Sequence, residues 1–84
     1  MTSTNARIRI VTLPGDGIGQ EVVPAALAVM EAAQSAVGGF RLEVEERRDM
    51  GALYYRDTGE DISKAAFEAA RAADAILLGA MGWP

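Results

Sequence analysis

Residues 13–23 read LPGDGIGQEVV, with glycine at positions 15, 17 and 19, directly after a run of strand-forming residues. That run, RIRIVTL at 7–13, alternates and then becomes continuously apolar, which predicts a strand with Ile8, Ile10 and Val11 entering a core. The proline that follows cannot donate to a β-ladder, and the glycines favour a turn, so the strand should end here. The stretch therefore predicts a strand, a tight turn and a helix in succession.

The helix is predicted from Gln20 to about Val37, where apolar residues recur at steps of three and four. Pro24 is tolerated only near the first turn, where its missing N–H is not needed, so we expect the helix to begin at about Ile18–Gln20. Two glycines at 38 and 39 supply a C-terminal stop. The apolar stripe expected to face the core comprises Val22, Ala26, Val29, Met30, Ala33 and Val37.

Two more strands and one more helix are predicted downstream. Residues 40–45 alternate between apolar and charged side chains, which predicts a half-exposed strand near a sheet edge. Residues 51–61 are loop-like, and Ser63 is a good N-cap for a helix over 64–73. The apolar run 75–84, AILLGAMGWP, is typical of a strand buried on both faces. The order β-α-β-α-β predicts an α/β fold with parallel strands joined by right-handed crossovers.

Composition narrows the class of protein. The chain has 84 residues, half of them hydrophobic, which leaves room for one globular domain. A net charge of −4 with interspersed signs argues against nucleic-acid binding. Cysteine and histidine are absent, so the sequence offers no disulfide, no thiolate metal site and no histidine base. With no signal peptide and no apolar run of roughly 18–20 residues, we expect a soluble, cytoplasmic protein without membrane contact.

The glycine stretch does not fit an ordinary dinucleotide-binding loop. A Rossmann fingerprint reads G-x-G-x-x-G, whereas this stretch reads G-x-G-x-G, one residue short. The acid that binds a ribose hydroxyl should follow by ~20 residues, but Asp49 lies about 30 residues past Gly19. Asp16 would also repel a pyrophosphate held in the loop. A plain alternative is a tight turn in which Asp16 bonds free N–H groups of the turn or of a helix start.

LPGDGIGQEVV and ADAILLGAMGWP, joined by GALYYRDTGEDIS, resemble the N-terminal portion of the β-decarboxylating dehydrogenases that act on isocitrate, isopropylmalate and tartrate or D-malate. The resemblance covers residues 7–84, with Gln20 standing where the family usually has proline. It implies the β-α-β-α-β start of the isopropylmalate dehydrogenase-like fold, which is not a Rossmann fold and need not keep the Rossmann spacing. Residues 1–84 would then be the N-terminal part of a single α/β dehydrogenase domain.

The resemblance also implies cofactors and site residues. The family uses NAD or NADP, with Mg²⁺ or Mn²⁺, and is homodimeric. Ile18 matches a residue that packs against the adenine end of the cofactor, and Trp83 and Pro84 begin a loop that runs along its nicotinamide side. The catalytic tyrosine and lysine, the arginine cluster and the metal-binding aspartates of relatives match nothing here. No catalytic role goes to Tyr54, Tyr55 or Lys64, and we expect an inactive fragment.

Three groups of side chains could have either a functional or a merely structural role. The acids at 57, 60 and 61 would form a hard-metal cluster or a solvated loop. Arg47 and Arg48 would bind a phosphate or line the polar face of a strand. Trp83 would stack on a cofactor or fill a core or interface.

Three functions stay open on the sequence. The first is a fragment of an NAD(P)-dependent oxidative decarboxylase of malate-type 2-hydroxy acids. Isopropylmalate and tartrate or D-malate are the substrate classes considered, and YY and GWP favour the latter. The second is a small stand-alone nucleotide-binding module without catalysis. The third is a non-functional truncation whose exposed sheet edge drives association.

Overall fold

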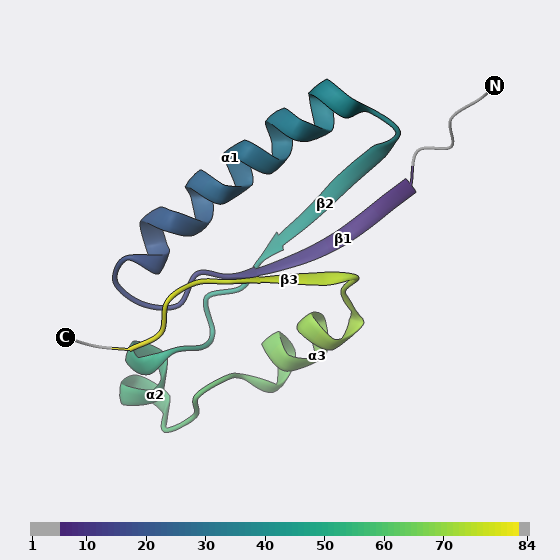
Figure 1. The fold of residues 1–84 in the computed structure, drawn as a ribbon. Coiled ribbons are helices and arrows are strands. Elements are labelled where there is room, and N and C mark those ends of the chain that lie inside the picture. The colour runs from purple at the N-terminus through teal and green to yellow at the C-terminus, as the bar shows by residue number, and fades with distance from the viewer. Residues whose placement is uncertain (1–5, 83–84) are drawn as a thin grey trace.

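The computed structural model describes residues 6–82, which form three parallel strands and three helices (Figure 1). Strand β1 lies in the centre of the sheet, in the order β2-β1-β3. Ala6 pairs with Phe40, and Ile10 pairs with Ala75, so β3 lies beside only the second half of β1. The elements are β1 (Ala6–Leu13), α1 (Gly19–Val37), β2 (Phe40–Glu46), α2 (Ala52–Thr58), α3 (Lys64–Ala72) and β3 (Ala75–Leu78).

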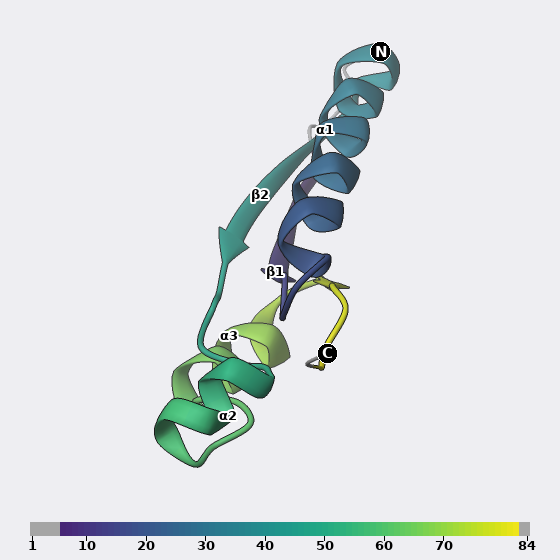
Figure 2. The same cartoon turned by 90° about the vertical axis from the view of Figure 1, so that its left-hand side faces the viewer.

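The helices lie on the two faces of this sheet. Helix α1 leads from β1 to β2 on one side, and the chain then returns past β1 to β3 on the other side. Crossovers of one hand running in opposite directions place their helices on opposite faces. Figures 1 and 2 show this arrangement, with α1 over one face and α3 over the other. The α/β class and the parallel sheet expected from the sequence are therefore confirmed.

The core is concentrated at the carboxyl end of β1. The last four residues of this strand, 10–13, are buried, whereas three of the first four are exposed. Val23 of α1 and Ala66 of α3 are buried as well. The predicted start of α1 is confirmed at Gly19, and so is the N-cap of α3, where Ser63 Oγ accepts the N–H of Ala66 at 2.9 Å.

The predicted loop over 51–61 is wrong for most of its length, because residues 52–58 form α2. The helix ends at Gly59, which has the left-handed conformation that glycine adopts at a helix C-terminus. Gly51 at its start has no side chain to cap the helix. The cap comes from a residue far away in sequence, so the local pattern contains no start signal.

The predicted inward stripe of α1 is shifted. Val22, Val29 and Val37 are exposed, and the buried residues of the helix are Gly19 and Val23. Neighbouring helical residues differ by about 100° around the axis, so Val23 rather than Val22 faces the sheet. The close packing of Gly19 on Pro14, described below, fixes this rotation.

The prediction that β3 is buried on both faces is also wrong for the described residues. Ile76 and Leu78 are 52% and 59% exposed, because β3 is an edge strand of four residues. The other edge strand, β2, alternates as expected between half-buried and exposed residues over its first half. Among the helices of residues 6–82, none combines the length and apolar character needed to cross a bilayer.

Candidate functional site

The glycine-rich loop packs directly on the loop that follows β3. A Cβ atom on Gly19 would lie 1.9 Å from the backbone oxygen of Pro14, and one on Gly79 would lie 2.1 Å from the same oxygen. Both distances are far below van der Waals contact, so neither position has room for a side chain. The backbone N–H of Asp16 donates to the oxygen of Ala80 at 2.8 Å. The loops after β1 and β3 therefore form one unit at the carboxyl end of the sheet.

The N-terminus of α1 is closed by the loop itself. The N–H groups of Gly19–Val22 donate to the backbone oxygens of Asp16, Gly17 and Ile18 at 2.9–3.1 Å. A helix start that binds phosphate does so with N–H groups that have no other partner. Three of the four groups at this helix start, those of Gly19, Gln20 and Glu21, are thus already used by backbone oxygens of the loop.

Asp16 is the buried acid of this region, with 4% of its surface exposed. Its Oδ2 accepts the N–H of Ala52 at 2.8 Å and that of Gly82 at 3.0 Å, and its Oδ1 accepts the N–H of Leu53 at 3.2 Å. The N–H groups of Gly82, Ala52 and Leu53 lower the pKa of the Asp16 carboxyl, and burial opposes them in part. Backbone N–H groups rather than a cation of the described residues therefore favour the ionised form of this carboxyl.

The turn interpretation expected the Asp16 side chain to bond N–H groups of its own turn or of the helix start that follows it, whereas the side chain bonds the start of another helix. That helix is α2. This partner lies 36 residues further along the chain, so it could not be predicted from the spacing of residues within the glycine stretch.

Gln20 connects the loop to the segment after β2. Its Nε2 donates to the backbone oxygen of Gly15 at 2.5 Å, and its Oε1 accepts from Arg48 Nη1. Arg48 also pairs with Glu46 through Nε at 2.5 Å. The sequence showed Gln20 only as a departure from the family's proline, and its contact with Arg48 was not predicted because it depends on the segment after β2 lying beside the loop in space.

Arg47 and Asp49 form a second polar group at the end of β2. Arg47 donates to both carboxylate oxygens of Asp49 at 2.6 and 3.1 Å, and it also contacts Glu45. Ser63 donates to Asp49 from its hydroxyl. The bonds from Arg47 and Ser63 lower the pKa of Asp49 against the effect of burial. Both arginines considered for phosphate binding are thus engaged with acids, and they follow β2 rather than lying on it.

Of the predicted cofactor residues, Ile18 lies at this same end. Ile18 is 62% exposed at the N-cap of α1. Trp83 and Pro84 lie outside the described residues. Gly82, however, donates to Asp16, two residues before Ile18. The structure therefore brings the Ile18 loop and the segment leading to Trp83 to one carboxylate.

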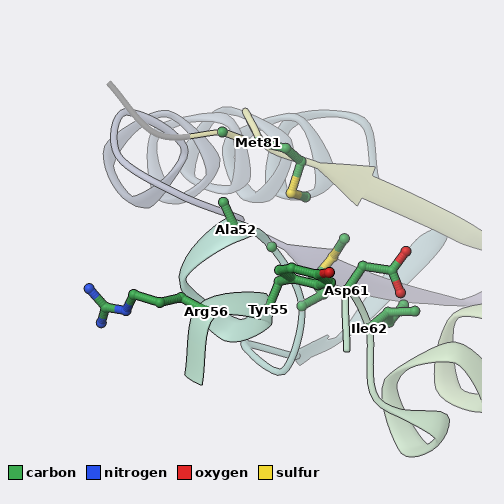
Figure 3. Close-up of a pocket in the computed structure, with 9 residues that line it drawn as sticks. Ala52, Tyr55, Arg56, Asp61, Ile62 and Met81 are labelled. Atoms are coloured by element: carbon green, nitrogen blue, oxygen red, sulfur yellow. The ribbon is translucent and has the colours of Figure 1, made fainter. Parts of the chain in front are cut away.

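An open, mostly apolar hollow of about 920 Å³ adjoins Asp16 on the α2 side. Figure 3 shows Tyr55, Ile62 and Met81 around it, with Arg56 extending away from them. The sequence did not predict it, because α2 was expected to be a loop. Within residues 6–82, no three acids, histidines or cysteines gather as a metal site would require, and the acids at 57, 60 and 61 are exposed, as in the solvated-loop interpretation. The lining residues are Met50, Gly51, Ala52, Tyr55, Arg56, Asp61, Ile62, Met81 and Gly82.

A parallel sheet with joined loops at its carboxyl ends defines the class of open α/β proteins that bind ligands at that edge. More specifically, residues 9–84 match the isocitrate/isopropylmalate dehydrogenase family model, and the chain belongs to this family. A 3-isopropylmalate dehydrogenase of Streptomyces avermitilis is 47% identical over 77 residues, and that of Chlorobium chlorochromatii is 45% identical over 76 residues. These alignments cover 92% and 90% of this chain but 21% of each relative.

Proposed function

We propose that this chain supplies the N-terminal part of an NAD(P)-dependent oxidative decarboxylase of malate-type 2-hydroxy acids. The observation that supports this most strongly is the 47% identity to a 3-isopropylmalate dehydrogenase over 92% of the chain. Isopropylmalate and tartrate or D-malate are the substrate classes proposed. The complete enzyme is proposed to be a cytoplasmic homodimer that uses Mg²⁺ or Mn²⁺.

The proposed role of the chain is to contact NAD(P). Ile18 offers an exposed apolar side chain for the adenine end, and the N–H groups behind it are occupied, so packing rather than phosphate binding would hold the cofactor here. Trp83 and Pro84 are proposed for the nicotinamide side. The bound cofactor would accept the hydride when the substrate hydroxyl is oxidised, and the β-carboxylate would leave as CO₂.

The remaining chemistry is proposed to lie elsewhere in the complete enzyme. Residues 6–82 contain no cluster of acids that fits a divalent metal, so the metal ligands are proposed to come from other parts of the complete enzyme. The described tyrosines, Tyr54 and Tyr55, lie on α2, and no catalytic role is proposed for them. Without metal ligands and proton-transfer groups, these 84 residues alone should be inactive.

The first experiment is the intact mass of the native protein from its source, followed by dehydrogenase assays. A mass several times that of 84 residues, with NAD- or NADP-dependent oxidation of isopropylmalate, D-malate or tartrate, is the expected result. A long protein that oxidises none of the three acids would contradict the proposal. A native mass of 84 residues combined with nucleotide affinity would instead favour the stand-alone binding module.

A further inference from the structure

Asp16 binds three segments that are distant in sequence. Its own loop follows β1, its carboxylate holds the first two N–H groups of α2, and the same carboxylate holds Gly82 after β3. Its backbone N–H donates to Ala80. We propose that Asp16 is a positioning residue of the cofactor site, which sets the separation between Ile18 and Gly82. The inference rests on the proposed function and adds a residue to it.

The contacts of the Asp16 carboxylate with the start of α2 and with Gly82 are called the Asp16 junction below, and their chemistry favours a rigid arrangement. A buried carboxylate is costly unless its charge is compensated by hydrogen bonds. Three backbone N–H groups provide this compensation for Asp16, and charge-assisted bonds of this kind are stronger than neutral ones. Backbone donors have no rotamers, so the position of the carboxylate fixes the two segments that donate to it, the start of α2 and Gly82.

Gly51 provides the space that this contact needs. Its φ of +110° lies in the region that favours glycine, and a Cβ there would approach the two carboxylate oxygens of Asp16 to 2.9 and 3.0 Å. The hydrogen bonds of Asp16 to the start of α2 therefore require both the acid at position 16 and a residue without a side chain at position 51. A substitution at Gly51 offers a second way to disturb the junction without touching the acid.

The division of the bonds makes asparagine a poor replacement for Asp16. Oδ2 accepts two N–H groups and Oδ1 accepts one. An amide keeps one acceptor oxygen and presents an NH₂ group at the other position, where it faces an N–H donor. In one orientation the contact to Leu53 is lost, and in the other the contacts to Ala52 and Gly82 are lost.

The competing explanation is a purely structural one, in which Asp16 stabilises the fold and leaves the cofactor site unaffected. A stabilising residue lowers the melting temperature when removed but does not change binding of the folded enzyme. A positioning residue changes cofactor affinity at temperatures where the variant is fully folded. The two roles are separated by comparing KM for NAD(P), KM for the acid substrate and kcat.

The test uses the complete dehydrogenase with D16N and G51A, and with D74N as a matched control. Asp74 is also an aspartate that accepts a backbone N–H, that of Arg9 at 2.8 Å, but it is exposed and lies before β3 at the other end of that strand. We expect the KM for NAD(P) and its directly titrated Kd to rise about tenfold in D16N and in G51A, the loss of one charge-assisted bond. The acid KM and kcat should change less than about twofold, and D74N should match the wild type.

Unchanged cofactor Kd in folded D16N and folded G51A would overturn the inference, whatever their melting temperatures. If D16N does not fold, the titration of G51A decides alone. A wild-type enzyme that binds no NAD(P) would overturn the proposed function instead, so the two failures are distinguishable.

Discussion

The two ends of the sheet are built differently. At the carboxyl end, Leu13, Asp16 and Gly19 are buried and the loops after β1 and β3 are in contact. At the amino end, β1 begins exposed, and a Cβ added to Gly38 or Gly39 would meet nothing within 4 Å. One helix, α1, joins both ends, so the contrast arises from the loops rather than from the secondary structure.

This difference separates positions that must keep their residue from positions that only connect elements. The carboxyl end, where open α/β sheets bind ligands, combines three features: closely packed backbones, a buried charge and the proposed cofactor contact. The amino end needs only a turn. Three pairs of substitutions and one pH profile therefore test the comparison, and they follow in order of expected effect.

The largest effect is expected for Gly19→Ala against Gly39→Ala. The new Cβ at 19 would lie 1.9 Å from the Pro14 oxygen, so the backbone must move at a cost of several kcal/mol. The alanine at 39 has open space and meets only the penalty of positive φ, about 1–2 kcal/mol. Denaturant unfolding of both variants in the complete enzyme measures the free energies. Equal losses would contradict the contrast between the ends.

The next effect is a dependence of stability on pH. The folded pKa of Asp16 is lowered, so its ionised form stabilises the fold at all pH values above the unfolded pKa of about 3.8. This stabilisation is lost as the pH falls through the lower folded pKa. Unfolding between pH 7 and pH 2 should therefore show a steeper acid loss for the wild type than for D16N.

Asp49, whose pKa is lowered mainly by the bond from Arg47, should add to the acid loss in both proteins. The double variant D16N/D49N should have the flattest profile. A wild type and a D16N variant with parallel acid profiles would show that Asp16 is not the group responsible.

A smaller and more specific effect is expected for Ile18→Ser against Val29→Ser. Both side chains are exposed, Ile18 at the N-cap of α1 and Val29 in the middle of this helix, so neither change should alter the melting temperature by more than a few degrees. Ile18→Ser should raise the KM for NAD(P) several-fold because apolar contact area is lost, by about 1–2 kcal/mol. Val29→Ser should leave this KM unchanged. Steady-state kinetics with varied cofactor measures both.

The smallest effect is expected for Gln20→Ala against Gln34→Ala. Gln20 donates to Gly15 at the carboxyl end, and Gln34 accepts the N–H of Leu42 at 2.5 Å toward the other end of α1. Each variant loses about 1 kcal/mol of stability, the net value of an ordinary hydrogen bond. Hydrogen exchange should quicken in residues 15–19 for the first variant and in residues 40–44 for the second. If hydrogen exchange instead changed at the end of α1 opposite to the substituted glutamine, the effect of each hydrogen bond would not be local.

Local patterns predicted those elements whose signals are adjacent in sequence. The strand ending at Leu13 and the helix starting at Gly19 followed from proline, glycine and apolar spacing, and the cap of α3 followed from Ser63. The family was also recognisable from the GDGIG stretch and the apolar run before Trp83. Each of these depends on side chains within a few residues of one another.

The features that were missed all depend on distant partners. Helix α2 lacks a cap of its own, because Asp16 supplies it from 36 residues away. The rotation of α1 is fixed by Gly19 against Pro14, which hydrophobic spacing alone does not encode. The exposure of Ile76 reflects the edge position of β3, and strand order is a property of the sheet rather than of the strand.

The central position of β1 has a consequence for the order of folding. Its pairing with β2 joins residues near 10 to residues near 44, whereas its pairing with β3 must wait for residues 75–78. A chain synthesised from its N-terminus can therefore form β1, α1 and β2 first, while the Asp16 carboxylate is still hydrated. Of the contacts that Asp16 makes, its bond to Gly82 can form only after those to Ala52 and Leu53, so this carboxylate exchanges water for backbone donors in steps as the chain emerges from the ribosome.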